Sequence, residues 1–204
     1  MSDPKQPLAL FDFDKTLTDG DSFYRFIVFT NNKSRIVAGF ISLLPWLAGY
    51  KAGILSNNYV KEKVIRWFFK GEQKESFSWK CREFVKQDLV NIEKKVAMER
   101  LNWHQKSGHK IIVVSASIED YLHPWCNIHN IEGIGTKLET ENGRLTGNFA
   151  TPNCYGYEKI RRLQENIDLE KYHPVYAYGD SPGDYEMLAL ADYPYFRTFK
   201  DSSR

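Results

Sequence analysis

The chain has 204 residues, of which 42% are hydrophobic and 26% charged, and its formal net charge is +2. This length suits one globular domain with a modest insertion, and the small charge without an arginine-rich arm excludes nucleic acid as an expected partner. The three cysteines are odd in number and far apart. They do not indicate a disulfide framework, so we expect a cytoplasmic protein.

The first predicted strand is residues 8–14, LALFDFD, which carries Asp12 and Asp14 at its end. Alternate residues of a strand point to the same side, so these carboxylates converge if the strand stays extended that far. Two like charges this close repel each other, and a metal ion, a proton or a nearby cation has to relieve the repulsion.

Residues 21 to about 108 show no strand pattern and predict a helical insertion after the first strand. Within it, residues 36–50 carry no charge but fall short of the about 20 residues that span a membrane. We interpret them as a buried helical hairpin that turns near Pro45, with a surface that touches lipid or an oily substrate as the alternative. The basic residues that follow predict a solvated face, with contact to an anionic substrate or a lipid headgroup as the alternative: Lys61, Lys63, Arg66 and Lys70.

The rest of the chain alternates strands and helices. Residues 109–117 and 174–180 predict buried strands, and YPYFR near Tyr195 predicts an edge strand because of Pro194. Residues 134–149 predict a hairpin around Asn142-Gly143, and Ser117–Asp120 has the pattern of a helix capping box. Buried strands separated by helices predict a parallel sheet covered on both faces, which is an α/β fold.

Parallel sheets bind ligands at the carboxyl ends of their strands. This sequence places four polar side chains there: Asp12, Asp14, Ser115 and Asp180. Asp184 opens the next helix, and carboxylates without an accompanying His or Cys favour a hard cation such as Mg²⁺. Ser115 near a helix start offers a seat for an anion, and Lys159 supplies a positive charge. Together these groups predict phosphoryl transfer.

The motifs, in this order, resemble those of the haloacid dehalogenase superfamily of phosphohydrolases. They are Asp12 to Thr16, Ser115, Lys159, and Gly179-Asp180 through Asp184. The helical insertion and the segments GTKLETENGRLTG and CYGYEK resemble its phosphoserine-phosphatase-like branch, subfamily IB. The resemblance implies a Rossmann-like core, a parallel sheet flanked by helices, made of residues 1–20 and 106–204. It also implies a helical cap over residues 21–105.

The resemblance further implies catalytic and metal-binding roles. Asp12 would be the nucleophile that forms an aspartyl phosphate, and Asp14 the general acid/base. Mg²⁺ would be held by Asp12, by the backbone carbonyl of Asp14 and by Asp180, with Asp184 orienting the surroundings of the metal. Lys159 would balance the charge of the phosphoryl group.

Substrate-binding roles are implied in the same way. Thr16 and Ser115 would hold the phosphoryl group, and Asp21 would meet a substrate ammonium, as an acidic residue does in phosphoserine phosphatases. Lys15 stands where many members of the family have glycine, and we expect its side chain to point away from the two aspartates.

Several alternatives stay open. An isolated DxD also occurs in glycosyltransferases, although that function leaves Lys159 and Asp180 without a role. A phosphotransferase would pass the phosphoryl group to an acceptor other than water, and a non-catalytic module would bind metal and a partner only. For a phosphatase, the expected substrate is a phosphorylated small molecule or a lipid phosphate, the latter with peripheral membrane contact through the cap. The sequence leaves the oligomeric state open.

Overall fold

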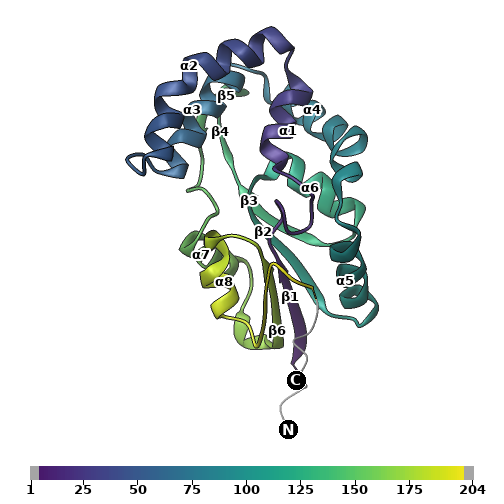
Figure 1. Ribbon diagram of the computed structural model, residues 1–204. Coiled ribbons are helices and arrows are strands. Elements are labelled where there is room, and N and C mark those ends of the chain that lie inside the picture. The colour runs from purple at the N-terminus through teal and green to yellow at the C-terminus, as the bar shows by residue number, and fades with distance from the viewer. Residues whose placement is uncertain (1–4, 200–204) are drawn as a thin grey trace.

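The protein's structure, a computed structural model, describes residues 5–199 and is built on a five-stranded parallel sheet (Figure 1). The strand order is β3-β2-β1-β6-β7. The strands are β1 (Gln6–Phe11), β2 (Lys110–Ile118), β3 (Glu132–Thr136), β6 (Tyr172–Gly179) and β7 (Tyr193–Phe196). The chain first builds outward from β1 to β3 and then continues on the other side of β1 with β6. The carboxyl end of β1 therefore lies at the point where the strand order reverses, which is where such sheets bind ligands.

Helices cover both faces of the sheet, which confirms the predicted α/β fold. They are α5 (Lys95–Lys106) and α6 (Glu119–Ile128) on one face and α7 (Tyr157–Asn166) and α8 (Tyr185–Ala189) on the other. The alternation of strand side chains creates the two layers. Ala9 and Phe11 of β1 join the core that includes α5 and α6, whereas Leu8 and Leu10 join the core that includes α7 and α8.

Every named element between β1 and β2 is helical. The first four helices are α1 (Ser22–Thr30), α2 (Lys33–Lys51), α3 (Asn57–Phe69) and α4 (Lys74–Gln87), followed by a 3-10 turn over Leu89–Ile92 and by α5. Figure 1 shows α1 to α4 beyond the carboxyl ends of the strands, at the opposite end of the molecule from the N-terminus. The helix α5 instead packs against the sheet. The division into core and cap at residues 20/21 and 105/106 stays a prediction.

The predicted hairpin near Pro45 is wrong, because α2 runs without interruption from Lys33 to Lys51 with Pro45 inside it. Proline removes the hydrogen bond to the carbonyl four residues earlier, that of Ile41. Ile41 is exposed, so water can hydrate that carbonyl and the helix continues. The chain turns later, at Gly53, whose φ of 73° lies in the left-handed region that glycine tolerates.

The predicted hairpin over residues 134–149 is correct only in its second part. Strands β4 (Leu138–Glu141) and β5 (Arg144–Phe149) form the hairpin, whereas residues 132–136 form β3 of the main sheet. The glycines of β3 obscured this strand, because glycine is rare in strands. They allow close contact with α6 and β2: a Cβ at Gly133 would lie 2.8 Å from Cys126 Sγ, and one at Gly135 would lie 2.6 Å from the Ser117 carbonyl oxygen.

Candidate active site

The carboxyl ends of β1, β2 and β6 meet at a cavity of about 310 Å³. Core residues form its floor: Asp12, Asp14, Ser115, Lys159, Asp180 and Asp184. Helices α1, α2 and α3 supply most of the opposite wall, with Phe23, Leu47, Tyr50, Val60 and Val64. The predicted strand-end residues are thus brought together from distant parts of the chain, beneath an apolar wall.

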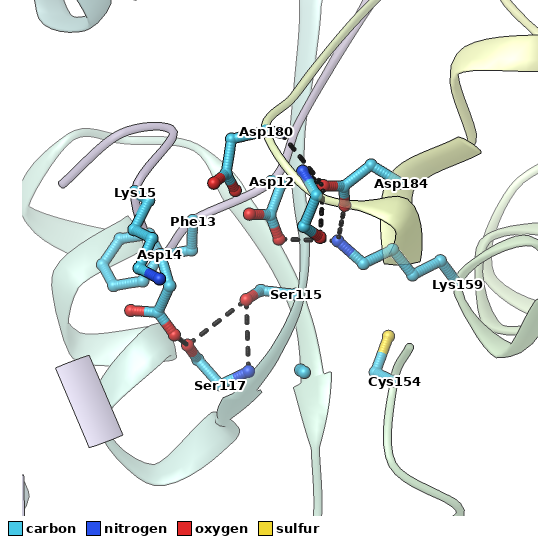
Figure 2. Close-up of polar contacts among 12 residues, drawn as sticks. Asp12, Phe13, Asp14, Lys15, Ser115, Ser117, Cys154, Lys159, Asp180 and Asp184 are labelled. Atoms are coloured by element: carbon cyan, nitrogen blue, oxygen red, sulfur yellow. Dashed lines mark hydrogen bonds and ion pairs between the residues drawn. The ribbon is translucent and has the colours of Figure 1, made fainter. Parts of the chain in front are cut away.

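Three of the predicted carboxylates form one group. Carboxylate oxygens of Asp12, Asp180 and Asp184 lie within 4.8 Å of one another, and Figure 2 shows them around a common centre. The ammonium of Lys159 donates at 2.6 Å to Asp12 Oδ1 and at 2.6 Å to Asp184 Oδ1. One lysine faces three carboxylates, so the group retains negative charge that a cation would neutralise.

The turn after β6 positions Asp184. Its Oδ2 accepts hydrogen bonds from the backbone N–H of Asp180 at 3.1 Å and of Ser181 at 3.0 Å. Gly179 makes room for this turn, because a Cβ at that position would lie 2.4 Å from Asp184 Cβ. Gly179, the first glycine in YGDSPGD, therefore permits the close approach of Asp184 to the end of the strand.

Burial sets the electrostatics of the Asp12–Lys159 pair. Asp12 is 7% and Lys159 2% exposed. Burial raises the pKa of Asp12 to about 7, although Lys159 opposes this shift. Burial alone would lower the pKa of Lys159, but Asp12 and Asp184 outweigh it and the net pKa of the lysine is raised. The lysine therefore stays charged and favours the ionised form of Asp12.

Asp14 lies beside this group and forms its hydrogen bonds elsewhere. Strand β1 ends at Phe11, so the predicted extended strand through Asp14 is wrong. The Asp14 carboxylate accepts from the Ser22 N–H at 2.7 Å and from Ser117 Oγ at 2.8 Å, and Figure 2 shows it directed toward Ser117. Burial and then Asp21 raise the pKa of Asp14, which favours its protonated form relative to an exposed aspartate.

The segment after β2 differs from the predicted capping box. Strand β2 continues to Ile118, which is the N-cap of α6 and makes no side-chain cap hydrogen bond. Ser117 does not cap the helix because its hydroxyl donates to Asp14 and its N–H donates to Ser115 Oγ at 3.1 Å. Ser115 is buried and lines the cavity. Ser117 is a site residue that sequence reasoning missed, and its alternation with Ser115 in the strand was the available signal.

Thr16 is the predicted site residue that does not line this cavity. It lines a neighbouring cavity of about 450 Å³, which shares only Lys15 and Asp180 with the first. Thr16 Oγ1 is the one buried side-chain oxygen or nitrogen in residues 5–199 without a hydrogen-bond partner. Lys15 has a φ of 60°, and this left-handed conformation explains physically why glycine suits its position.

Two residues link the helical wall to this floor. Asp21 lines the cavity and is the N-cap of α1, where its side chain accepts from the Tyr24 N–H at 2.9 Å. Lys61 of α3 also lines the cavity, and its ammonium donates at 2.6 Å to the carbonyl of Ala116, beside Ser115. The predicted solvated face is therefore wrong for Lys61, whose pKa is lowered by burial, and its position in the cavity fits the alternative of contact with an anionic substrate. The sequence does not distinguish Lys61 from the other basic residues of this run, so its position in the cavity was not predicted.

The donor set fits the predicted metal. Asp12, Asp180 and Asp184 offer only carboxylate oxygens, which are the ligands of hard cations such as Mg²⁺. Within residues 5–199, this is the only cluster of three or more Asp, Glu, His or Cys side chains close enough to hold an ion.

Comparisons with known proteins agree with this geometry. The family model described as haloacid dehalogenase-like hydrolase matches residues 9–189. Protein CicA of Caulobacter vibrioides is 32% identical over 95% of this chain and 86% of its own length. Histidinol-phosphatase of Neisseria meningitidis is 28% identical over 92% of this chain and 88% of its own length.

Solved structures share the fold. A protein of unknown function from Bordetella pertussis has a TM-score of 0.77 and 21% identity, covering 92% of this chain and 87% of the other. An apo phosphoserine phosphatase has a TM-score of 0.64 and 16% identity, covering 92% and 84%. The comparisons confirm the predicted family resemblance and the prediction of a phosphatase-like hydrolase. The chain therefore belongs to the haloacid dehalogenase-like hydrolase family.

Proposed function

We propose that the protein is a Mg²⁺-dependent phosphomonoester hydrolase that acts through an aspartyl phosphate on Asp12. The observation that carries the proposal is the position of Lys159, whose ammonium contacts Asp12 and Asp184 at 2.6 Å each, with Asp180 in the same group. The ammonium favours the ionised form of Asp12 against the effect of burial, and it places positive charge where a phosphoryl group would bind. A surface lysine near acidic residues would not provide this.

The reaction has two steps. In the first, an Asp12 carboxylate oxygen attacks phosphorus, the bond from phosphorus to the alcohol oxygen breaks, and Asp14 gives its proton to the departing alkoxide. In the second, water loses a proton to Asp14 and attacks the same phosphorus, which releases phosphate and regenerates the Asp12 carboxylate. The raised pKa of Asp14 supports its role as the first proton donor, and its hydrogen bonds to Ser22 and Ser117 hold it in place.

Asp12, Asp180 and Asp184 would hold Mg²⁺, together with the backbone carbonyl of Asp14. When bound, the ion supplies charge neutralisation at the phosphoryl oxygens. Ser115 would donate a hydrogen bond to the phosphoryl group. Thr16 does not line the Asp12 cavity and its hydroxyl has no hydrogen-bond partner, so the proposal gives it no direct contact with the phosphoryl group.

The proposed substrate is a small phosphorylated metabolite or a lipid phosphate. Asp21 at the cavity supports a substrate with an ammonium group. The histidinol-phosphatase relative supports a small phosphorylated metabolite as the substrate. The apolar residues Leu47, Val60 and Val64 on the opposite wall support a lipid or another apolar alcohol as the leaving group. A screen of phosphorylated metabolites and lipids, with released phosphate as the readout, distinguishes these substrates.

The nucleophile is tested with Asp12→Asn. We expect turnover to disappear while the circular dichroism spectrum is retained. The matched control is Asp19→Asn, which makes the same change at an exposed carboxylate outside the cavity and should keep activity. EDTA should stop the wild-type reaction and Mg²⁺ should restore it. Normal steady-state turnover by Asp12→Asn would refute the assignment.

Two other functions remain as outcomes of the same assay. A phosphotransferase would transfer the phosphoryl group to an added alcohol in preference to water, which product analysis detects. A non-catalytic metal-binding module would bind Mg²⁺ without releasing phosphate from any compound in the screen.

A further inference from the structure

The helix α2 is apolar on two faces. Gly39 and Leu43 face inward and are buried, and the helix packs against α3. On the outer side, four large apolar residues are 47–61% exposed, and we call them the α2 stripe: Val37, Phe40, Ile41 and Leu44. Their i, i+3, i+4, i+7 spacing places them on one side of the helix. A surface helix normally presents polar residues on that side.

Cations stand at both ends of the α2 stripe. Lys33 and Lys51 are 18 positions apart, about five helical turns, so both lie on the same side as the stripe, and both are exposed. No Asp or Glu occurs anywhere between Asp21 and Glu62. The surface is therefore apolar along its length, cationic at each end, and free of acidic side chains from its own segment.

From this pattern we propose that the α2 stripe docks on an anionic lipid surface. The apolar side chains enter the boundary between headgroups and acyl chains, and the lysines extend to the anionic headgroups. Among the described residues no helix meets the requirements of length and hydropathy for crossing a bilayer, so the helix lies along the surface. The inference concerns binding alone and does not depend on the proposed hydrolase activity.

A second copy of the chain fits the same surface less well. A symmetric pair of helices brings the same residues of both copies together. An antiparallel pair would place Lys33 of one copy near Lys51 of the other, and a parallel pair would place like ends together. Neither arrangement supplies an acidic partner from residues 22–61, whereas an anionic membrane supplies many.

The test is flotation of the full chain with vesicles of phosphatidylcholine, with or without phosphatidylglycerol. We expect binding to the anionic vesicles that weakens with salt. Phe40→Ser with Ile41→Ser should weaken binding at least about tenfold, because two large apolar side chains no longer enter the lipid. Lys33→Glu and Lys51→Glu should each weaken it at least about fivefold. The matched control Ile128→Ser, an exposed apolar position on α6, should bind like the wild type.

Three further readouts keep the test decisive. The Phe40→Ser/Ile41→Ser double variant should keep the wild-type unfolding temperature and its turnover of p-nitrophenyl phosphate. If this variant fails to fold, the two glutamate variants provide the test. Failure of the wild type to float, or wild-type binding by the Phe40→Ser/Ile41→Ser double variant, would overturn the proposal. A dimer of the wild type in sedimentation without lipid, together with a monomer for the Phe40→Ser/Ile41→Ser double variant, would overturn the proposal in favour of a second copy.

Discussion

Replacing Lys159 by methionine isolates the charge balance of the site. Methionine fills a similar volume without the ammonium that contacts Asp12 and Asp184 at 2.6 Å. Both carboxylates are almost fully buried, at 7% and 1% exposed, and would face each other without a counter-charge. Removing one partner from a buried ionic group lowers stability by about 3–5 kcal/mol, because the remaining charge is uncompensated.

The assay is thermal unfolding in EDTA at neutral pH and again near pH 4. For a chain of this size, 1 kcal/mol corresponds to about 2–4 °C, so we expect the unfolding temperature to fall by about 6–20 °C at neutral pH. Without Lys159, the pKa of Asp12 rises still further above its unfolded value. A carboxyl whose pKa is higher in the folded than in the unfolded protein destabilises the folded protein when it is ionised. The loss of stability in Lys159→Met is therefore greatest above about pH 7 and shrinks as the pH falls.

The matched control is Arg161→Met on the same helix. Arg161 pairs with Glu158 and Glu165 at the surface, where such pairs contribute about 0–1 kcal/mol. A deficit for Lys159→Met that is no larger than that of the control would refute the argument. An equal drop in the unfolding temperature of Lys159→Met at both pH values would also refute it, because protonation of the carboxylates would then not restore stability.

Three other outcomes follow from the geometry. Ser117→Ala removes the hydroxyl that holds Asp14, and we expect kcat to fall about tenfold with little change in KM, as steady-state kinetics will measure. Gly135→Ala should lower the free energy of unfolding by about 1–3 kcal/mol, because its Cβ meets the Ser117 carbonyl oxygen at 2.6 Å, whereas Gly20→Ala, with nothing within 4 Å, should not; urea titration compares them. In EDTA, wild-type stability should fall as the pH rises from about 4 to 7, since the folded pKa of Asp12 is raised to about 7, and Asp12→Asn should flatten this dependence; identical slopes would contradict it.

The sequence was sufficient where local pattern and chain order agree. Buried apolar runs predicted the central strands, and their order predicted that Asp12, Ser115 and Asp180 meet at one edge. This works because parallel strands bring their carboxyl ends together whatever their separation in the chain. It failed where local signals misled: β3 contains glycines because α6 packs close to it, and α2 continues through Pro45, where the residue that loses its helical hydrogen bond, Ile41, is exposed.

The sequence by itself therefore determined the α/β architecture, the family and which side chains gather at the strand ends. Tertiary structure alone decided which of them touch. The two aspartates of the first motif have different partners: Asp12 pairs with Lys159, and Asp14 accepts a hydrogen bond from Ser117. Thr16 does not line the cavity that both aspartates line. The physical reason is that β1 ends at Phe11: the turn that follows, rather than strand alternation, directs each later side chain, and contacts with distant segments fix that turn.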